Sequence, residues 1–217
     1  MPDAQGILTN LRLIANDRIA TAVAWHFAVA ICGLALALGW RPSRRLAGLL
    51  LSAPVASVGV IAALHGNPFN AAMFGVITAV LVGITSRHGP DEVQGGATVD
   101  KIVGAVMIAF AWLYPHFLEA RPATYLYAAP MGLIPCPTLA LVIGFGLLSG
   151  GLASRAWSFT LAAAGLFYGL FGVLRLGVRL DLFLVAGAVA LLLSTFRMRR
   201  ARTVGWSRCF MGSPSVR

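Results

Sequence analysis

Long apolar runs, separated by short segments that hold nearly all the charge, constrain this chain more than any other feature. The runs are about 17–20 residues long, which is the length that a helix needs to cross a hydrocarbon core of about 30 Å. Of the 217 residues, 59% are hydrophobic and only 11% are charged, against about 25% charged in soluble domains. The sequence therefore predicts an all-α integral membrane protein, a multi-pass helical bundle.

Six or seven spans are expected, and seven is the working number. Residues 65–68, His-Gly-Asn-Pro, separate the second span from the third, so these two form a tight hairpin in which Pro68 opens the later helix. The last span is the least regular, because Arg179 and Asp181 lie in its first turn and its apolar part begins at Leu182. The expected spans cover residues 19–39, 46–64, 68–86, 102–118, 131–149, 156–174 and 178–196.

The basic residues predict the orientation. Cytoplasmic segments of membrane proteins carry an excess of Lys and Arg, and placing the N-terminus outside puts most of the 17 basic residues inside. We therefore expect a polar segment over 1–18 outside, one transmembrane bundle over 19–196 and a cytoplasmic tail over 197–217, in a cell inner (plasma) membrane. The basic residues of the tail are placed to meet anionic lipid of the bilayer: Arg197, Arg199, Arg200 and Arg202.

The formal charge of +10 does not indicate nucleic acid as a partner. The arginines lie at the ends of the apolar runs and in the tail, and not along one amphipathic face. Membrane topology accounts for that distribution.

Polar side chains gather toward the side predicted to be outside. Polar groups at membrane depth are expensive and often functional, so this clustering indicates an outer vestibule for a small molecule or an ion. Its candidate residues are His65, Asn67, Asn70, Tyr114, His116, Glu119, Cys136 and Thr138. Prolines interrupt the helices nearby, and the expected helix breaks are Pro68, Pro115, Pro135 and Pro137.

The stretch Gly-Leu-Ile-Pro-Cys-Pro-Thr, residues 132–138, places two prolines around a cysteine at the head of a span. Proline costs about 3 kcal/mol in a helix interior but little in a first turn, so either the helix start is irregular or the helix begins near Pro137. The favoured interpretation is that Cys136 is a small packing side chain, while backbone carbonyls or the Thr138 hydroxyl face a polar pocket.

A metal site is the weaker interpretation of the same residues. His116 and Glu119 are three residues apart and share a face if the helix continues past Pro115, and Cys136 and His65 lie at similar depth. No pair has a recognised ligand spacing, however, and the three cysteines are too dispersed for a disulfide framework or a CxxC-type zinc site. We expect no metal, no cofactor and no catalytic residue.

Three blocks carry a likeness to a known family: His65 to Gly75, Tyr114 to Leu148 and Tyr168 to Leu192. In them the chain resembles an uncharacterised family of small bacterial multi-pass membrane proteins, a domain of unknown function with a GxxPCPT signature. The resemblance implies a shared helical bundle and a shared outer-face site, and it implies no reaction.

Three functions remain open from the sequence. The first is a transporter or permease of a small molecule or ion, because broken helix starts that face a polar vestibule are typical of transport sites. The second is a structural or accessory subunit that binds a partner. The third is a membrane enzyme that uses His65, His116, Glu119 and Cys136 with a metal. The sequence does not indicate the substrate or the oligomeric state.

Overall fold

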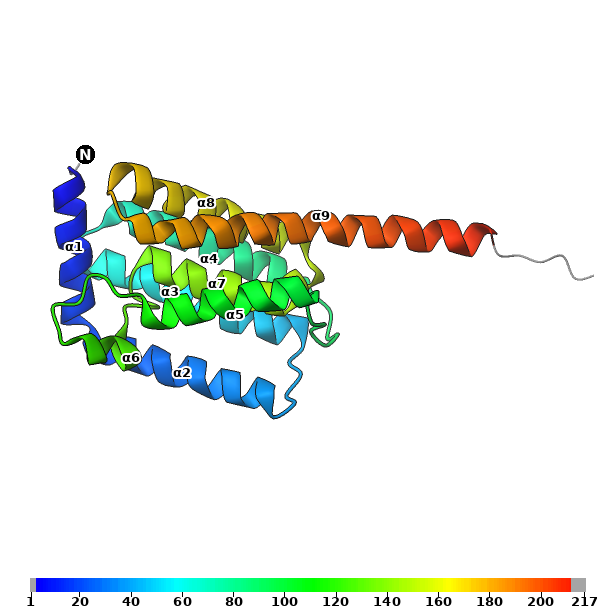
Figure 1. Ribbon diagram of the computed structural model, residues 1–217, viewed down its shortest axis with the longest axis horizontal. Helices are drawn as coiled ribbons and strands as arrows, with labels where there is room; N and C mark the ends of the chain where they lie inside the picture. Colours follow the sequence, from blue (N-terminus) through cyan, green and yellow to red (C-terminus); the bar gives the residue numbers. More distant parts are fainter. Residues whose placement is uncertain (1–2, 212–217) are drawn as a thin grey trace, which may run out of the picture.

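The computed structural model describes residues 3–211, and the side chains of residues 3–197 (Figure 1). Within these residues the structure is helical, and the only β-type pairing is an isolated bridge between Ser43 and Glu92. The α-helices are α1 (Ala4–Asp17), α2 (Ile19–Ala37), α3 (Arg44–Leu64), α4 (Pro68–Thr85), α5 (Thr98–Leu113), α6 (Tyr125–Ala128), α7 (Pro135–Leu148), α8 (Arg155–Arg175) and α9 (Leu182–Met211). Three 3-10 helices connect them: η1 (Pro122–Thr124), η2 (Gly150–Ala153) and η3 (Arg179–Asp181).

Five helical segments are long and apolar enough to cross a membrane. They are α2, α3, α4, α8 and the segment Arg179–Arg197, which joins η3 to the first part of α9. The described part of the chain is thus all-helical and consistent with the helical membrane bundle that the apolar runs predict. α5 and α7 have 16 and 14 residues, which is about 24 and 21 Å of helix at 1.5 Å per residue. Seven spans, and their orientation, stay predictions.

Three expected spans differ from the helices in their bounds. The span expected over 102–118 ends as a helix at Leu113, because Pro115 cannot continue it and disfavours helical backbone in the residue before it. α7 begins at Pro135 and not at 131. α9 begins at Leu182, as expected, but continues to Met211, since arginine is a good helix former and no proline interrupts that stretch.

α7 is the central helix of the bundle (Figure 1), and 11 of its 14 residues are buried. It packs against α3, α5, α8 and α9. Gly104 of α5 and Gly144 of α7 face each other so closely that a Cβ on either would meet the carbonyl oxygen of the other. The small residues therefore bring these two backbones into contact, as in other membrane helix pairs.

α8 and α9 meet along a second row of glycines. A Cβ on Gly165 would lie 3.0 Å from the Ala188 Cβ, and one on Gly169 would lie 2.7 Å from a Val185 methyl group. The GxxxG spacing in residues 165–169 thus forms a contact within the bundle.

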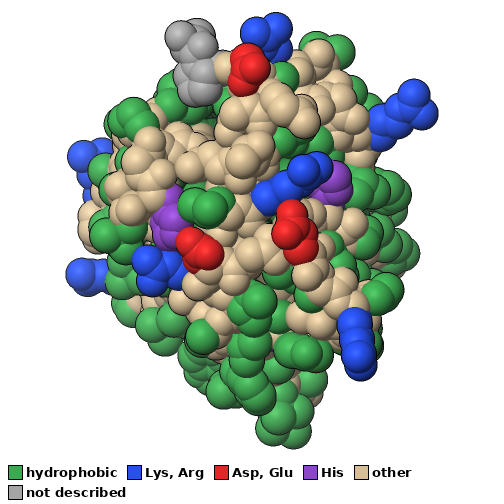
Figure 2. Space-filling model, turned by 90° about the vertical axis from the view of Figure 1, so that its left-hand side faces the viewer, with side chains coloured by type: hydrophobic (Ala, Val, Ile, Leu, Met, Phe, Trp, Pro, Cys, Tyr) green, Lys and Arg blue, Asp and Glu red, His purple; other side chains and the backbone are tan. Residues whose placement is uncertain are grey.

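α1 lies across one end of the bundle, nearly perpendicular to the other long helices, while α9 extends past the opposite end (Figure 1). We call these the α1 end and the tail end. α1 buries Leu11, Ile14 and Ala15 against the bundle, so the polar segment expected over 1–18 is largely an amphipathic helix. Figure 2 shows the α1 end face-on, with charged and histidine side chains on it and hydrophobic side chains on its flanks.

Candidate functional site

A cavity of about 460 Å³ lies at the α1 end, within the range of about 300–1,000 Å³ that is typical of small-molecule sites. α1, the turn between α3 and α4, the start of α7, the end of α8 and the segment through η3 enclose it. Its walls are mainly apolar. The polar side chains that line it are Asn10, Asn67, Asn70, Cys136, Tyr168, Arg175 and Asp181.

Asp181 brings a carboxylate to the cavity at a position that is only 1% exposed. Its Oδ1 accepts a hydrogen bond from the Tyr114 hydroxyl at 2.9 Å, and its Oδ2 accepts one from the Cys136 thiol at 3.2 Å. Both donors are neutral groups. In the described part of the chain, no Lys, Arg or His nitrogen lies within 4.0 Å of this carboxylate.

The backbone after α8 places Asp181. The Val178 amide donates to the Gly172 carbonyl at 2.9 Å, and the Asp181 amide donates to the Val178 carbonyl at 3.1 Å, so the chain turns back on α8 before α9 begins. Gly172 makes room for the side chain, because a Cβ at this position would overlap the Asp181 carboxylate. The buried acid therefore depends on a glycine nine positions earlier.

The Pro-Cys-Pro stretch forms the first turn of α7. Pro135 is the first helical residue and Pro137 is also in the first turn, where a missing N–H breaks no helical hydrogen bond. Cys136 is part-buried and lines the cavity, whereas both prolines are buried.

Thr138 does not face a pocket, contrary to the expectation from the sequence. Its hydroxyl is fully buried, donates to the Ile134 carbonyl at 2.7 Å and accepts from the Gly132 amide at 2.8 Å. Gly132 has φ +76°, and the Thr138 hydroxyl satisfies the backbone of this tight turn. The polar group that the stretch offers to the cavity is the Cys136 thiol.

The asparagines of the α3–α4 turn line the cavity as well. Asn70 is buried and its Oδ1 accepts from the Tyr168 hydroxyl at 3.0 Å. Asn67 caps α4 by accepting from the Asn70 amide at 3.1 Å, and it donates to Asn10 Oδ1 of α1 at 3.1 Å. Asn10 in turn donates to the His65 carbonyl at 3.2 Å. Pro68 lies at the first position of α4, as expected.

Three other predicted site residues are near this end but outside the cavity. The His65 ring contacts the Ile61 carbonyl, and it lies 3.9 Å from the Asp17 carboxylate. His116 follows Pro115 in the loop after α5, where burial, and then the neighbouring Arg12 guanidinium, hold its pKa below the usual 6.5. Glu119 is exposed, and its backbone amide donates to Asn16 Oδ1 of α1 at 2.9 Å.

These positions do not converge on a metal ion. α5 ends at Leu113, so His116 and Glu119 do not share a helical face. Within the described residues, no three His, Cys, Asp or Glu side chains lie close enough together to hold one metal. The described residues therefore do not assemble the ligands that the hypothesis of a His and Cys metal centre requires.

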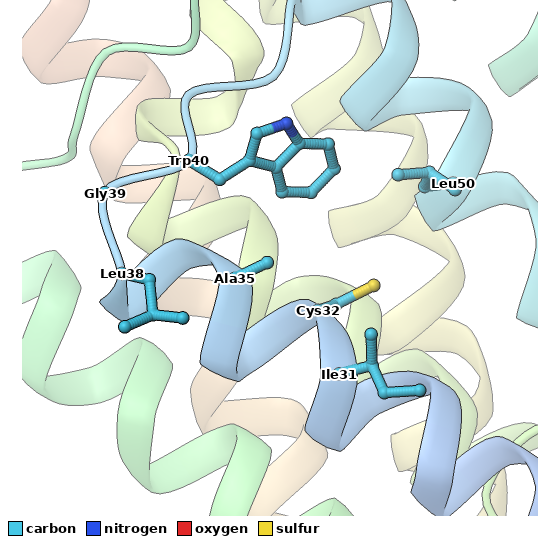
Figure 3. A pocket seen from close by; sticks show the side chains of 7 residues that line it. All are labelled: Ile31, Cys32, Ala35, Leu38, Gly39, Trp40 and Leu50. Atoms are coloured by element: carbon cyan, nitrogen blue, oxygen red, sulfur yellow. The ribbon is translucent and has the colours of Figure 1, made fainter.

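A second hollow is a shallow, apolar groove between α2 and α3 toward the tail end (Figure 3). Its lining residues are Ile31, Cys32, Ala35, Leu38, Gly39, Trp40 and Leu50. The buried positions of α2 are Ala22, His26 and Val29, so the second half of the helix, residues 30–37, has no buried residue. This groove has no charged lining, which distinguishes it from the cavity at the α1 end.

At the tail end, Arg197 pairs with the buried Asp100 of α5. Arg197 was expected to meet lipid, but its guanidinium pairs with Asp100 in the first turn of α5. The side chains of Arg199, Arg200 and Arg202 lie outside the described residues, so the lipid contact of the basic tail stays a prediction.

Comparison with protein-family models, curated proteins and solved structures gave no match to this chain. The resemblance to the GxxPCPT family therefore stays an expectation from the sequence, and a function for the cavity can be inferred only from its geometry and chemistry.

Sequence reasoning missed four polar residues that line the cavity: Asp181, Tyr168, Arg175 and Asn10. The sequence placed Asp181 with Arg179 in the first turn of the last span, but its carboxylate is buried and lines the cavity. The sequence did contain a signal for Asp181. This single acidic residue directly precedes a long apolar run, and it follows a segment rich in glycine. Asn10 was missed because its segment was not expected to fold over the bundle.

Proposed function

We propose that the protein is a permease-like membrane protein that accepts a small polar ligand in the cavity at the α1 end. The observation that carries this proposal is the cavity itself. It has the size of a small-molecule site, mainly apolar walls and a few converging polar groups, among them a buried carboxylate whose partners among the described residues are neutral. Buried ionisable groups in membrane proteins typically mark ligand or ion pathways.

In this proposal the α1 end faces outward from a cell inner (plasma) membrane and the tail end faces the cytoplasm. The positive-inside distribution of arginines supports that orientation. α5 and α7 act as two short additional spans, which gives seven in all. The short length of α7 is compatible with this role, because longer helices surround it and the residues of its middle are not exposed to lipid.

Passage through the protein requires a conformational change. On the tail-end side of the cavity, three residues of α7 are fully buried: Leu139, Ala140 and Val142. The bundle is therefore closed toward the tail end. We expect α8, η3 and α9 to move together. This segment carries Asp181, and α8 and α9 pack closely against each other along the glycines of α8.

The binding step can be tested with a pair of leucine variants at the end of α8. Leu176 lines the cavity, whereas Leu174 is 79% exposed and does not line it. Purified protein in lipid nanodiscs is screened by thermal shift against amino acids, amines, organic acids, sugars and inorganic ions. We expect at least one solute to raise the Tm of the wild type and of Leu174→Trp but not that of Leu176→Trp.

The proposal fails if no solute stabilises the wild type, or if Leu176→Trp responds as the wild type does. A solute that binds is then tested for uptake into proteoliposomes. Uptake supports a permease, and binding without uptake contradicts the transport part of the proposal.

A second candidate function, an accessory subunit, is favoured by one observation. α2 is an apolar helix of which only 11% of the spanning window is buried within the bundle, and the groove of Figure 3 runs along it. Cys32 lies in that groove, so a thiol-reactive cross-linker at Cys32 tests whether a partner helix lies there. A specific cross-linked product in native membranes that disappears in Cys32→Ser supports this function, and the monomer alone contradicts it.

A further inference from the structure

The charges around the cavity restrict the chemistry of its ligand. Asp181 lines the cavity beside Cys136 at a buried position, and Arg175 lines it from the exposed last turn of α8. The two are not paired with each other, since no described nitrogen is within 4.0 Å of the Asp181 carboxylate. Arg175 likewise has no carboxylate of the described residues within that distance.

A carboxylate with two neutral donors still lacks a counter-charge. Removing a charge from water costs several kcal/mol unless an opposite charge approaches it, so an ammonium group is the ligand group that best complements Asp181. Gly172 also lines the cavity and carries no side chain to cover the carboxylate. An ammonium group in this part of the cavity would contact Asp181 next to the Cys136 sulfur.

Arg175 supplies the opposite charge to the same cavity. A guanidinium binds a carboxylate through two parallel hydrogen bonds. The other walls of the cavity are mainly apolar, with Ile7, Leu11, Phe171 and Val178 among them.

We propose that the ligand is a small zwitterion of the amino-acid type with an apolar side chain, its ammonium group on Asp181 and its carboxylate on Arg175. This assignment rests on the proposed function, because it names the ligand class of the same cavity. Asn67 and Asn70 provide neutral hydrogen-bonding groups on the wall formed by the α3–α4 turn.

Four probes that share one carbon skeleton test the assignment. They are L-leucine, a zwitterion; L-leucinamide, a cation; 4-methylpentanoate, an anion; and 4-methylpentanamide, which is neutral. Binding to the full chain in nanodiscs is measured by calorimetry. We expect leucine to bind about ten-fold or more tightly than each of the other three, because hydrogen bonds to charged groups have this magnitude.

Charge-removing variants then assign each end of the ligand. Asp181→Asn should weaken leucine binding about ten-fold and leave 4-methylpentanoate unaffected, whereas Arg175→Gln should weaken leucine and leave leucinamide unaffected. Arg179→Gln, an exposed arginine outside the cavity, and Asp91→Asn at the tail end are matched controls and should bind leucine as the wild type does. Because Arg175 is exposed, its variant keeps the test valid even if Asp181→Asn does not fold.

Equal binding of leucine and 4-methylpentanamide, or an unchanged leucine affinity in Arg175→Gln, would overturn the zwitterion assignment. If leucine does not bind but a sugar or another uncharged solute does, and Leu176→Trp abolishes that binding, the assignment fails while the proposed function stands. If no solute binds, both fail.

Discussion

The Asp181 carboxylate lines the cavity and accepts hydrogen bonds from two residues of distant parts of the chain, Tyr114 and Cys136. Removing a buried hydrogen-bond partner leaves the remaining group unsatisfied, which costs more than the bond itself contributes. At the scale of single residues, the integrity of the site therefore depends on how strongly these two donors stabilise the carboxylate.

Tyr114→Phe tests the first donor. Without the hydroxyl, Asp181 Oδ1 loses its hydrogen-bond partner at a residue that is only 1% exposed, so we expect the free energy of unfolding to fall by about 1–3 kcal/mol. Tyr127→Phe is the matched control, because Tyr127 is 54% exposed. The measurement is denaturant unfolding in mixed micelles, and equal stability of the two variants would contradict the network.

His116 predicts a pH dependence of stability. Burial and the nearby Arg12 hold its pKa in the folded state below the unfolded value of 6.5, so the folded state binds fewer protons than the unfolded state. The contribution of His116 is therefore present above pH 6.5 and is lost as the pH falls through the lowered pKa. We expect His116→Asn to lose less stability than the wild type when the pH is lowered from about 7.5 to about 5.

Arg12→Gln should reduce the same loss in part, because the guanidinium is the second cause of the shift. Unfolding at the two pH values measures both effects. A wild type and His116→Asn with the same pH dependence would show that His116 is not perturbed.

Composition and position predicted some of these residues and not others. Asn67, Asn70 and Cys136 were expected at the site because they belong to the polar side chains on the side predicted to be outside, and all three line the cavity. Asp181 was not expected at the site. The direction of its side chain depends on the backbone turn between α8 and α9, which the sequence pattern does not reveal. Thr138 was placed in the pocket wrongly, since the sequence does not reveal that its hydroxyl serves the backbone of residues 132–134.

At the scale of elements, α8 and α9 are held together by residues that lack side chains. Gly165 and Gly169 allow the two helices to approach, and Gly172 accommodates the Asp181 carboxylate. Gly165 and Gly169 have the GxxxG spacing that is common where membrane helices pack closely. Helices α2 to α4 also lie close to their expected bounds, because each apolar run ends at charged or turn-forming residues.

Gly172→Ala should destabilise the protein although alanine is the better helix former. The new methyl group would overlap the Asp181 carboxylate, and overpacking of this kind costs about 1–3 kcal/mol. Gly75→Ala in α4 is the control, because a Cβ there meets nothing within 4 Å and the change should be neutral or stabilising by up to about 1 kcal/mol. Unfolding of both variants in micelles gives the comparison, and a neutral Gly172→Ala would contradict the packing.

α1 is the longest element that the sequence did not predict. Its apolar residues form a short stripe in an otherwise polar segment, and a helix of 14 residues stays marginal in water without packing. The asparagines Asn10 and Asn16 attach it to the turn at His65 and to the loop at Phe117 and Glu119. These contacts are long-range in the chain, so no local pattern indicates them.

At the scale of the whole molecule, the bundle is closed toward the tail end and holds a cavity toward the α1 end. The apolar runs predicted the all-helical membrane type, and five helices have the length and hydropathy for it. The number of spans is less well determined by the sequence, because α5 and α7 are short and the enclosure of α7 by its neighbours is a tertiary property.

If the proposed function is correct, the cavity admits water-soluble molecules from the outer side as far as Cys136. The direct measurement is the reaction of single-cysteine variants, in intact cells, with a small methanethiosulfonate reagent that does not cross membranes. Cys136 is kept alone by Cys32→Ser and Cys209→Ser. Cys32 alone controls for a thiol in the apolar groove, and Ser86→Cys in a cysteine-free chain reports on the exposed tail end.

We expect that Cys136 reacts in intact cells, that Cys32 does not, and that Ser86→Cys reacts only after the cells are permeabilised. Reaction of Cys136 from outside would show that the cavity is open to water on that side of the membrane. A Cys136 that stays unmodified even in permeabilised cells, or a Ser86→Cys that reacts in intact ones, would contradict the proposed cavity entrance and orientation.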